Sequence, residues 1–139
     1  MHEVYENSVR FEETDAQGIV FYGNYATYQD EAFTEYMAAI GHPYGDVEDY
    51  EWDVHVVNLE LNYHAPARFR DRLINSMRVG RIEHSSLVLE YECHNTDGDL
   101  LADGTVTHVV VDDSGSPIRV PEELREAIAA YQETPPKTA

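Results

Sequence analysis

Hydrophobic and polar residues alternate with two different periods along this chain. Over residues 25–40 apolar side chains recur every three or four positions, which predicts an amphipathic helix. From Asp53 onward the period becomes two, as in β-strands with one covered face. Segments rich in glycine, aspartate and asparagine separate these runs and predict turns. The pattern predicts strands at 4–12, from Asp53 to about Tyr63, and at 72–81, 85–95 and 100–111, with a long helix at 25–40 and a short final helix from Pro121 to about Tyr131.

Single residues refine this outline. Gly41, followed by Pro43, is expected to end the long helix. Residues 44–52 are expected to form an acidic loop, and Gly104 predicts a bulge or a close backbone approach inside the last strand. In the strand after Asp53, one face is expected to carry the apolar side chains of Val57, Leu59, Leu61 and Tyr63.

The element order predicts an α+β architecture, with one long helix packed against a mainly antiparallel sheet of five strands. A chain of 139 residues is long enough for one domain with a real core and too short for two. We assign residues 1–133 to that domain and expect residues 134–139 to be a disordered tail.

The charge balance excludes several classes of partner. Asp and Glu number 27 and Lys and Arg number 9, with Lys137 the only lysine. Nucleic acids and anionic membrane surfaces need basic protein surface, so neither is expected as a partner. The acidic residues are spread along the whole chain, as on halophilic proteins, whose self-repulsion is screened by concentrated salt. No apolar run is long enough to span a membrane and residues 1–6 lack signal-peptide features, so a cytoplasmic protein is expected.

Candidate chemistry concentrates in residues 10–25. Asp15 lies three residues before Gly18 in an acidic loop, and an apolar run then leads to Gly23, Asn24 and the predicted helix. Asp15 can act as a nucleophile or as a general base toward water. Asn24 is a good helix N-cap, and the free N–H groups at a helix N-terminus suit a developing oxyanion. Without further evidence, an aspartate before a capped helix is typical of an ordinary solvated loop.

The segment resembles the active-site segment of the 4-hydroxybenzoyl-CoA thioesterase-like family of hotdog-fold acyl-CoA thioesterases. The matching positions are Asp15, Gly18, Asn24 and Tyr25, and the resemblance continues through residues 63–68 and 85–87. It implies a hotdog fold, in which a curved sheet wraps around a central helix. It also implies Asp15 as the catalytic carboxylate, with the backbone of Tyr22 and Gly23 near the thioester carbonyl.

The family's substrates carry coenzyme A, whose phosphates need local positive charge on this acidic chain. Five of the eight arginines fall within residues 68–81, and arginine suits bidentate phosphate contacts. The resemblance adds Ser85 and Ser86, which begin a strand that lies beside the pantetheine arm in relatives. We therefore expect substrate contacts from Gly18, Asn24, Tyr25, Arg68, Arg81, Ser85 and Ser86.

Other catalytic classes lack their sequence signatures. The seven histidines and Cys93 show none of the short spacings typical of metal sites, and no Gly-x-Ser-x-Gly nucleophile elbow occurs. We expect no metal or redox cofactor, and an acyl-CoA substrate hydrolysed by a homodimer or homotetramer, as the resemblance implies. A hotdog hydratase or dehydratase, and a non-catalytic acyl-thioester binding protein, remain as alternatives.

Overall fold

The computed structural model describes residues 1–42 and 51–138. Its α+β architecture matches the sequence prediction, although the first strand ends at Ser8 and not at residue 12, because residues 11–13 wind into a short 3-10 turn. The predicted acidic loop lies almost wholly outside the described residues. The elements are β1 (His2–Ser8), η1 (Phe11–Glu13), α1 (Asn24–Ala39), β2 (Asp53–Tyr63), β3 (Arg72–Ile82), β4 (Ser86–Asn95), β5 (Leu100–Val111), α2 (Glu122–Tyr131) and β6 (Lys137–Thr138).

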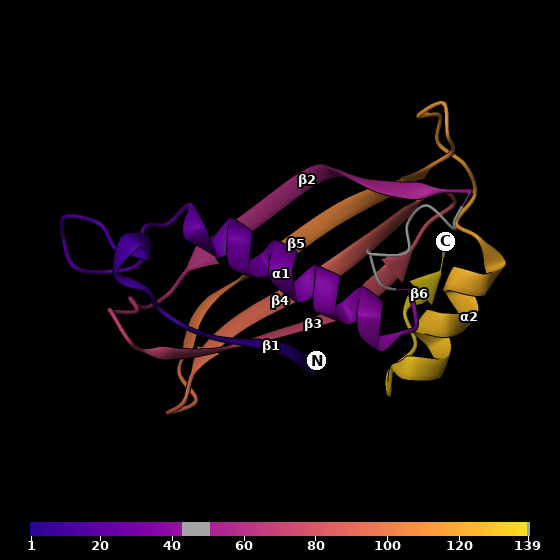
Figure 1. Ribbon diagram of the computed structural model, residues 1–139. Coiled ribbons are helices and arrows are strands. Elements are labelled where there is room, and N and C mark those ends of the chain that lie inside the picture. Colours follow the sequence, from indigo (N-terminus) through magenta and orange to yellow (C-terminus); the bar gives the residue numbers. More distant parts are fainter. Residues whose placement is uncertain (43–50, 139) are drawn as a thin grey trace.

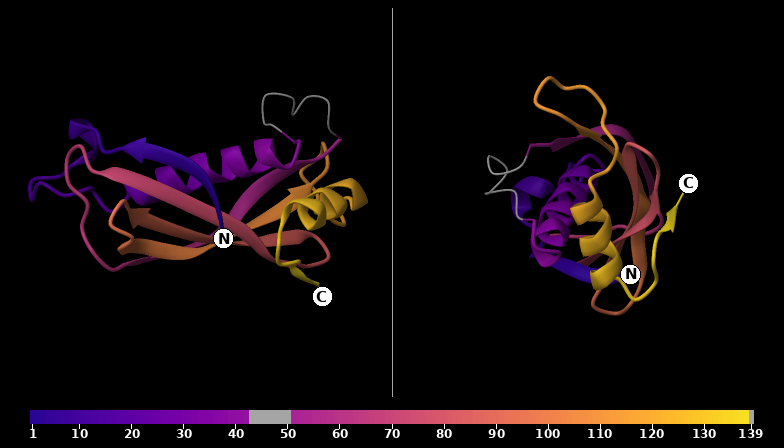
Figure 2. Two further views of the ribbon diagram at one scale, coloured as in Figure 1. Left: turned by 90° about the horizontal axis from the view of Figure 1, so that it is seen from below. Right: turned by 90° about the vertical axis from the view of Figure 1, so that its right-hand side faces the viewer.

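The strands form one sheet in the order β1-β3-β4-β5-β2, with every neighbouring pair antiparallel. The sheet curves around α1, which lies along its concave side, while α2 packs at the end opposite the α1 N-terminus (Figures 1 and 2). Part of the tail that was expected to be disordered forms a short strand instead, because Lys137–Thr138 pair in parallel with Arg81–Ile82. They do so because β1 pairs only with residues 72–77 of β3 and leaves the rest of that edge open.

Helix α1 has the predicted buried face and the predicted end. Gly41 takes a positive φ of 93° and donates its N–H to Ala38, and His42 donates to Met37 over 2.8 Å. These two bonds satisfy carbonyls that the last turn of a helix leaves open, and glycine adopts the required backbone without strain. The residues of α1 that are buried against the sheet are Tyr25, Tyr28, Gln29, Ala32, Phe33, Tyr36 and Met37.

Gly104 marks the predicted close backbone approach in β5. A Cβ there would lie 1.9 Å from the carbonyl oxygen of Glu60 on β2, so no larger residue fits without moving one strand. The position is not a bulge, since Gly104 stays in register with Leu61 and Tyr91.

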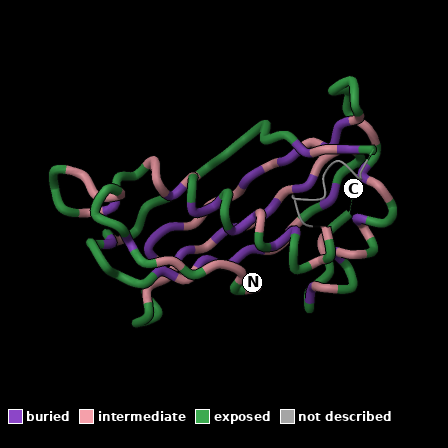
Figure 3. Tube along the Cα trace, viewed as in Figure 1, coloured by how far each residue is buried: buried purple, intermediate pink, exposed green. Residues whose placement is uncertain are grey.

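Strand β2 forms one edge of the sheet and is the least covered part of it. Val57 is 61 % exposed, Tyr63 49 % and Leu59 39 %, while Leu61 is half-buried. Figure 3 shows exposed backbone running along much of this strand. Leu59, Leu61 and Tyr63 share a face, as the period of two predicts, because they pair with alternate residues of β5, whereas Val57 lies at a register shift and has no partner in the ladder. Within one chain that face has little to pack against.

Candidate active site

Asp15 opens a tight turn between η1 and α1. Its N–H donates to the carbonyl of Ile19 and its carbonyl accepts from the N–H of Gly18, both over 2.9 Å. Gly18 closes the turn with a φ of 78°, a conformation that glycine adopts without strain. One carboxylate oxygen of the half-buried Asp15 accepts the N–H of Gln17 over 2.8 Å. Within the described residues its other oxygen has no hydrogen-bond partner, so it is available to a substrate or a water molecule.

The start of α1 supplies free backbone donors. Gly23 is the N-cap, so Asn24 is the first residue of the helix and not the cap that its type suggested. In residues 1–42 and 51–138, the N–H groups of Tyr22 and Gly23 donate to no acceptor, whereas those of Phe21 and Asn24 do. Two adjacent free N–H groups at the positive end of a 16-residue helix can stabilise an oxyanion.

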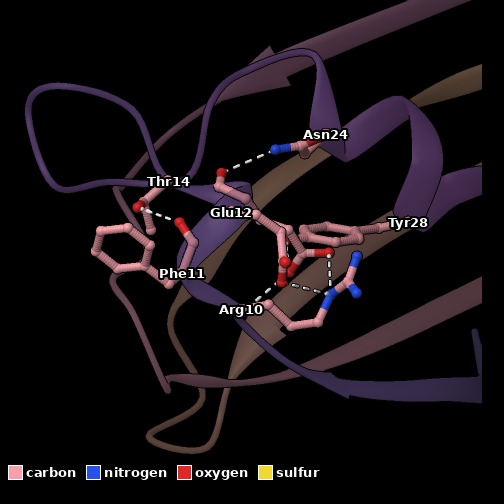
Figure 4. Close-up of polar contacts among 7 residues, drawn as sticks. Arg10, Phe11, Glu12, Thr14, Asn24 and Tyr28 are labelled. Atoms are coloured by element: carbon pink, nitrogen blue, oxygen red, sulfur yellow. Dashed lines mark hydrogen bonds and ion pairs between the residues drawn. The ribbon is translucent and has the colours of Figure 1, made fainter.

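Sequence reasoning missed Glu13, which links the Asp15 turn to α1. Its carbonyl accepts the N–H of Phe21 over 2.9 Å and the side-chain amide of Asn24 over 2.8 Å. Its carboxylate, whose side chain is 15 % exposed, accepts the Tyr28 hydroxyl over 3.0 Å and the N–H of Arg10 over 2.9 Å. Figure 4 labels three of the residues that Glu13 contacts, Arg10, Asn24 and Tyr28. The only signal in the sequence was an acidic residue two positions before Asp15, and one such residue is not distinctive in a chain that has 27 of them.

An apolar cavity of about 340 Å³ adjoins the start of α1. Tyr25 lies in its wall, almost fully buried, and burial raises the pKa of Tyr25 to about 12, so its hydroxyl stays neutral. Tyr63 contacts Tyr25 ring to ring and donates its hydroxyl to the carbonyl of Tyr22 over 3.1 Å. The lining residues are Ile19, Val20, Tyr22, Tyr25, Tyr63, His64, Ala65 and Pro66.

The predicted substrate contacts do not all lie at the end of the sheet that is next to this cavity. Arg68 does, because it pairs with Ile19 across a β-bridge. Arg81 lies at the far end of β3, where its guanidinium pairs with Glu83 over 3.2 Å, and at that same end Ser85 precedes β4 and Ser86 begins it. Since β3 has 11 residues at ~3.3 Å each, roughly 30 Å separates the two groups within one chain.

Other chemistry has little support. The described residues contain no group of three or more His, Cys, Asp or Glu side chains able to hold a metal ion. Burial raises the pKa of the Cys93 thiol to about 12, so it is an inert core residue. Two larger hollows, of about 470 and 490 Å³, lie over strands β3–β5 and beside α2, and charged side chains line much of both. An acyl chain fits the apolar cavity better.

Comparison with known proteins settles the family. The profile of the thioesterase superfamily matches residues 17–102. The chain belongs to the thioesterase superfamily. The matched span includes Gly18, the start of α1 and Arg68 but not Asp15, and the resemblance of the chain to hotdog-fold acyl-CoA thioesterases is confirmed.

Individual relatives agree with this assignment. The acyl-CoA thioester hydrolase YbgC of Escherichia coli is 31 % identical over 124 residues, which cover 88 % of this chain and 89 % of YbgC. The crystal structure of a Thermus thermophilus protein is similar with a TM-score of 0.85 and 30 % identity, over 94 % of this chain and all of that one. The DHNA-CoA thioesterase of Staphylococcus aureus has a TM-score of 0.81 and 28 % identity, over 88 % and 85 % of the two chains. The predicted hotdog fold is confirmed.

Proposed function

We propose that this protein hydrolyses an acyl-CoA thioester to a free carboxylic acid and coenzyme A. One observation carries the proposal: the Asp15 turn leads directly to the two free N–H groups of Tyr22 and Gly23, beside an apolar cavity, in a chain of the thioesterase superfamily. The names of YbgC and of the Staphylococcus aureus enzyme support the choice of acyl-CoA as substrate.

In the proposed mechanism the acyl group enters the apolar cavity and its carbonyl oxygen faces the start of α1. Asp15 either takes a proton from an attacking water molecule, which gives the free acid directly, or attacks the carbonyl carbon itself, which forms an acyl anhydride on Asp15 that water then hydrolyses to the free acid. The N–H groups of Tyr22 and Gly23 stabilise the negative oxygen that develops, the C–S bond breaks, and the coenzyme A thiolate takes up a proton. This chemistry requires no metal ion and no redox cofactor.

Release of free thiol from a panel of acyl-CoA esters tests the proposal. Asp15→Asn should lower turnover ~10²- to 10⁴-fold, as loss of a general base does, and more if Asp15 is a nucleophile. Gln17→Ala is the matched control, since Gln17 contacts Asp15 only through its backbone. Near-normal turnover by Asp15→Asn would contradict the assignment. Binding without thiol release would favour a non-catalytic binding protein, and hydration of an unsaturated acyl-CoA would favour a hydratase.

The active unit is proposed to be a homodimer, or a pair of dimers, with the site between two chains. Two observations support this: β2 has an unpaired edge with exposed apolar side chains, and the predicted substrate contacts are split between opposite ends of one chain. A two-fold antiparallel pairing of β2 with its copy would extend the sheet and cover that edge. It would also bring the Asp15 end of one sheet closer to the Arg81 end of the partner's sheet.

The proposed setting is the cytoplasm of a salt-adapted cell. In the described part of the chain, no helix is both long and apolar enough to cross a bilayer. The formal net charge of −18 supports salt adaptation, because a coenzyme A ester, itself an anion, would be repelled by this protein at low ionic strength.

A further inference from the structure

Next to the Asp15 turn lies a second tight turn, at residues 68–71, on the loop between β2 and β3. The N–H of Asp71 donates to the carbonyl of Arg68 over 3.0 Å, and the Asp71 carboxylate accepts the N–H of Arg68 over 2.8 Å. Arg68 also forms a β-bridge with Ile19, whose carbonyl holds the N–H of Asp15. The turn is therefore fixed beside the candidate active site at the left-hand end of Figure 1.

The guanidinium groups of Arg68 and Arg70 differ from the other arginines. Both residues are exposed, and neither guanidinium makes an ion pair or hydrogen bond within the described residues. Each of the other arginines contacts a carboxylate or a backbone carbonyl through its side chain. These engaged arginines are Arg10, Arg72, Arg78, Arg81, Arg119 and Arg125.

Arg70 also has an unfavourable backbone conformation. Its φ of 72° makes it the one non-glycine residue with positive φ in the part of the chain that is described. Glycine or asparagine would adopt this conformation at lower cost, and such strain concentrates where a side chain has a function. The sequence thus places a long cation where the turn geometry alone would favour glycine.

Two exposed aromatic rings lie beside these cations. Phe11 of η1 and Phe69 at the centre of the turn make an edge contact, with ring centroids 5.9 Å apart. Phe11 is 74 % exposed and Phe69 51 %, values that are high for phenylalanine in a folded domain. Exposed aromatic faces next to unpaired arginines suit a ligand that has both a flat ring and phosphate groups.

We propose that Arg68, Arg70, Phe11 and Phe69 bind the adenosine 3′,5′-bisphosphate end of coenzyme A, an inference that rests on the proposed function. The two guanidinium groups contact its phosphates and the adenine stacks on the exposed phenylalanine faces. This nucleotide site gives an acidic protein the local positive charge that a polyanionic substrate needs. Two arginines suit a mononucleotide, whereas a nucleic acid would meet the negative charge of the surrounding chain.

Comparing acyl-CoA with the matching acyl-pantetheine, which lacks the nucleotide and all phosphates, tests this site. For acyl-CoA, Arg68→Gln and Arg70→Gln should each raise KM about 5- to 10-fold with kcat nearly unchanged. Acyl-pantetheine should be hydrolysed equally well by the variants and the unaltered protein. Arg72→Gln is the matched control, because Arg72 is already paired with Glu6 over 2.7 Å and should leave both KM values unchanged.

Arg70→Gly separates binding from folding. Glycine relieves the positive φ, so its melting temperature should equal or exceed that of the unaltered protein while its KM for acyl-CoA still rises. Equal KM values for acyl-CoA in Arg68→Gln, Arg70→Gln and the unaltered protein would overturn the nucleotide site and leave the proposed function intact.

Titration calorimetry with adenosine 3′,5′-bisphosphate measures binding directly, and it tests this site even if the protein hydrolyses no thioester. A lack of thioester hydrolysis would reject the proposed function but not the nucleotide site. The unaltered protein should bind it at least about 5-fold more tightly than Arg70→Gln or Phe69→Ala. The same affinity for all three proteins would show that these residues contact something else, such as a second copy of the chain.

Discussion

The Tyr28 hydroxyl donates a hydrogen bond to the Glu13 carboxylate over 3.0 Å, joining the core face of α1 to the loop that carries Asp15. Burial and the nearby Glu13 charge both raise the pKa of Tyr28, so the hydroxyl remains a donor at any ordinary pH. Glu13 in turn holds Asn24 through its carbonyl. Glu13 is therefore a positioning residue, because it fixes the Asp15 turn relative to the start of α1.

Tyr28→Phe should destabilise the fold and reduce turnover. The substitution keeps the ring and leaves a largely buried carboxylate with one donor fewer, which costs ~1–3 kcal/mol of unfolding free energy. Denaturant unfolding measures that loss. Tyr131→Phe is the control, since the Tyr131 hydroxyl makes no hydrogen bond within the described residues.

The kinetic readout separates positioning from a general loss of folded protein. In Tyr28→Phe, kcat per folded molecule should fall several-fold while KM changes little, because the turn shifts relative to the helix and the cavity remains. Unchanged kcat together with reduced stability would assign the Tyr28–Glu13 contact to folding alone.

Local sequence patterns predicted the fold and the succession of the Asp15 turn and the start of α1. The period of the apolar residues placed α1 and the long strands, and Gly41 and Gly104 gave a helix end and a close approach that the structure contains. The arrangement around Glu13 could not be predicted, since it depends on contacts 11 and 15 residues away with Asn24 and Tyr28.

Pairing between distant strands was also beyond local patterns. The two-residue strand β6 forms only because β1 leaves part of β3 unpaired, and a short run such as Lys137–Thr138 has no period to read. Likewise, the sequence grouped Arg81 with Arg68 by proximity along the chain, although an extended strand carries them to opposite ends of the sheet.

Stability should decrease at mildly acidic pH because of His108. Its ring is buried, stacks on Phe33 at a centroid distance of 3.9 Å, and has no hydrogen-bond partner for either nitrogen among the described residues. Burial lowers the pKa of His108 from its ordinary 6.5 to about 4. The unfolded chain therefore binds this proton first, so stability falls as pH drops from 6.5 and levels off below 4.

The full effect of His108 corresponds to roughly 3 kcal/mol. Carboxylates titrate in part of the same range, so the quantity to measure is the difference in unfolding free energy between the unaltered protein and His108→Leu, from pH 7.5 to pH 4. His108→Leu should become relatively more stable as the pH falls. A difference that stays constant with pH would mean that His108 is accessible to protons in the folded state.

Concentrated salt should stabilise the protein and increase its activity. With 27 acidic side chains against 9 basic ones, like-charge repulsion opposes the compact state. The Debye length falls from ~10 Å at 0.1 M salt to ~3 Å at 1 M, which screens this repulsion and that between protein and substrate. Melting temperature and thiol release should both rise from 0.1 M to above 1 M potassium chloride. A flat or falling profile would argue against salt adaptation and favour a basic partner protein as the reason for the acidic surface.

A charge on the open edge of β2 should disrupt the proposed dimer. Val57 is 61 % exposed in the single chain, so Val57→Lys should be tolerated by the monomer fold and should prevent edge-to-edge pairing. Sedimentation in high salt should show a monomer with little activity. Thr96→Lys, in the turn between β4 and β5, adds the same charge away from this edge and should remain a dimer. A fully active Val57→Lys monomer would exclude a site shared between chains at this edge.

Mixing two inactive variants tests whether the partner completes the site. Asp15→Asn lacks the carboxylate, and Arg81→Glu places a negative charge among the predicted substrate contacts at the opposite end of the sheet. In a mixed dimer, the intact Asp15 of one chain would face the intact Arg81 of the other, which gives one working site out of two. Random pairing makes about half of the dimers mixed, so co-expression with separate affinity tags should recover roughly a quarter of normal activity from the total pool. If both residues serve a site within one chain, no mixture can recover activity, and full activity of Arg81→Glu alone would remove Arg81 from the substrate contacts.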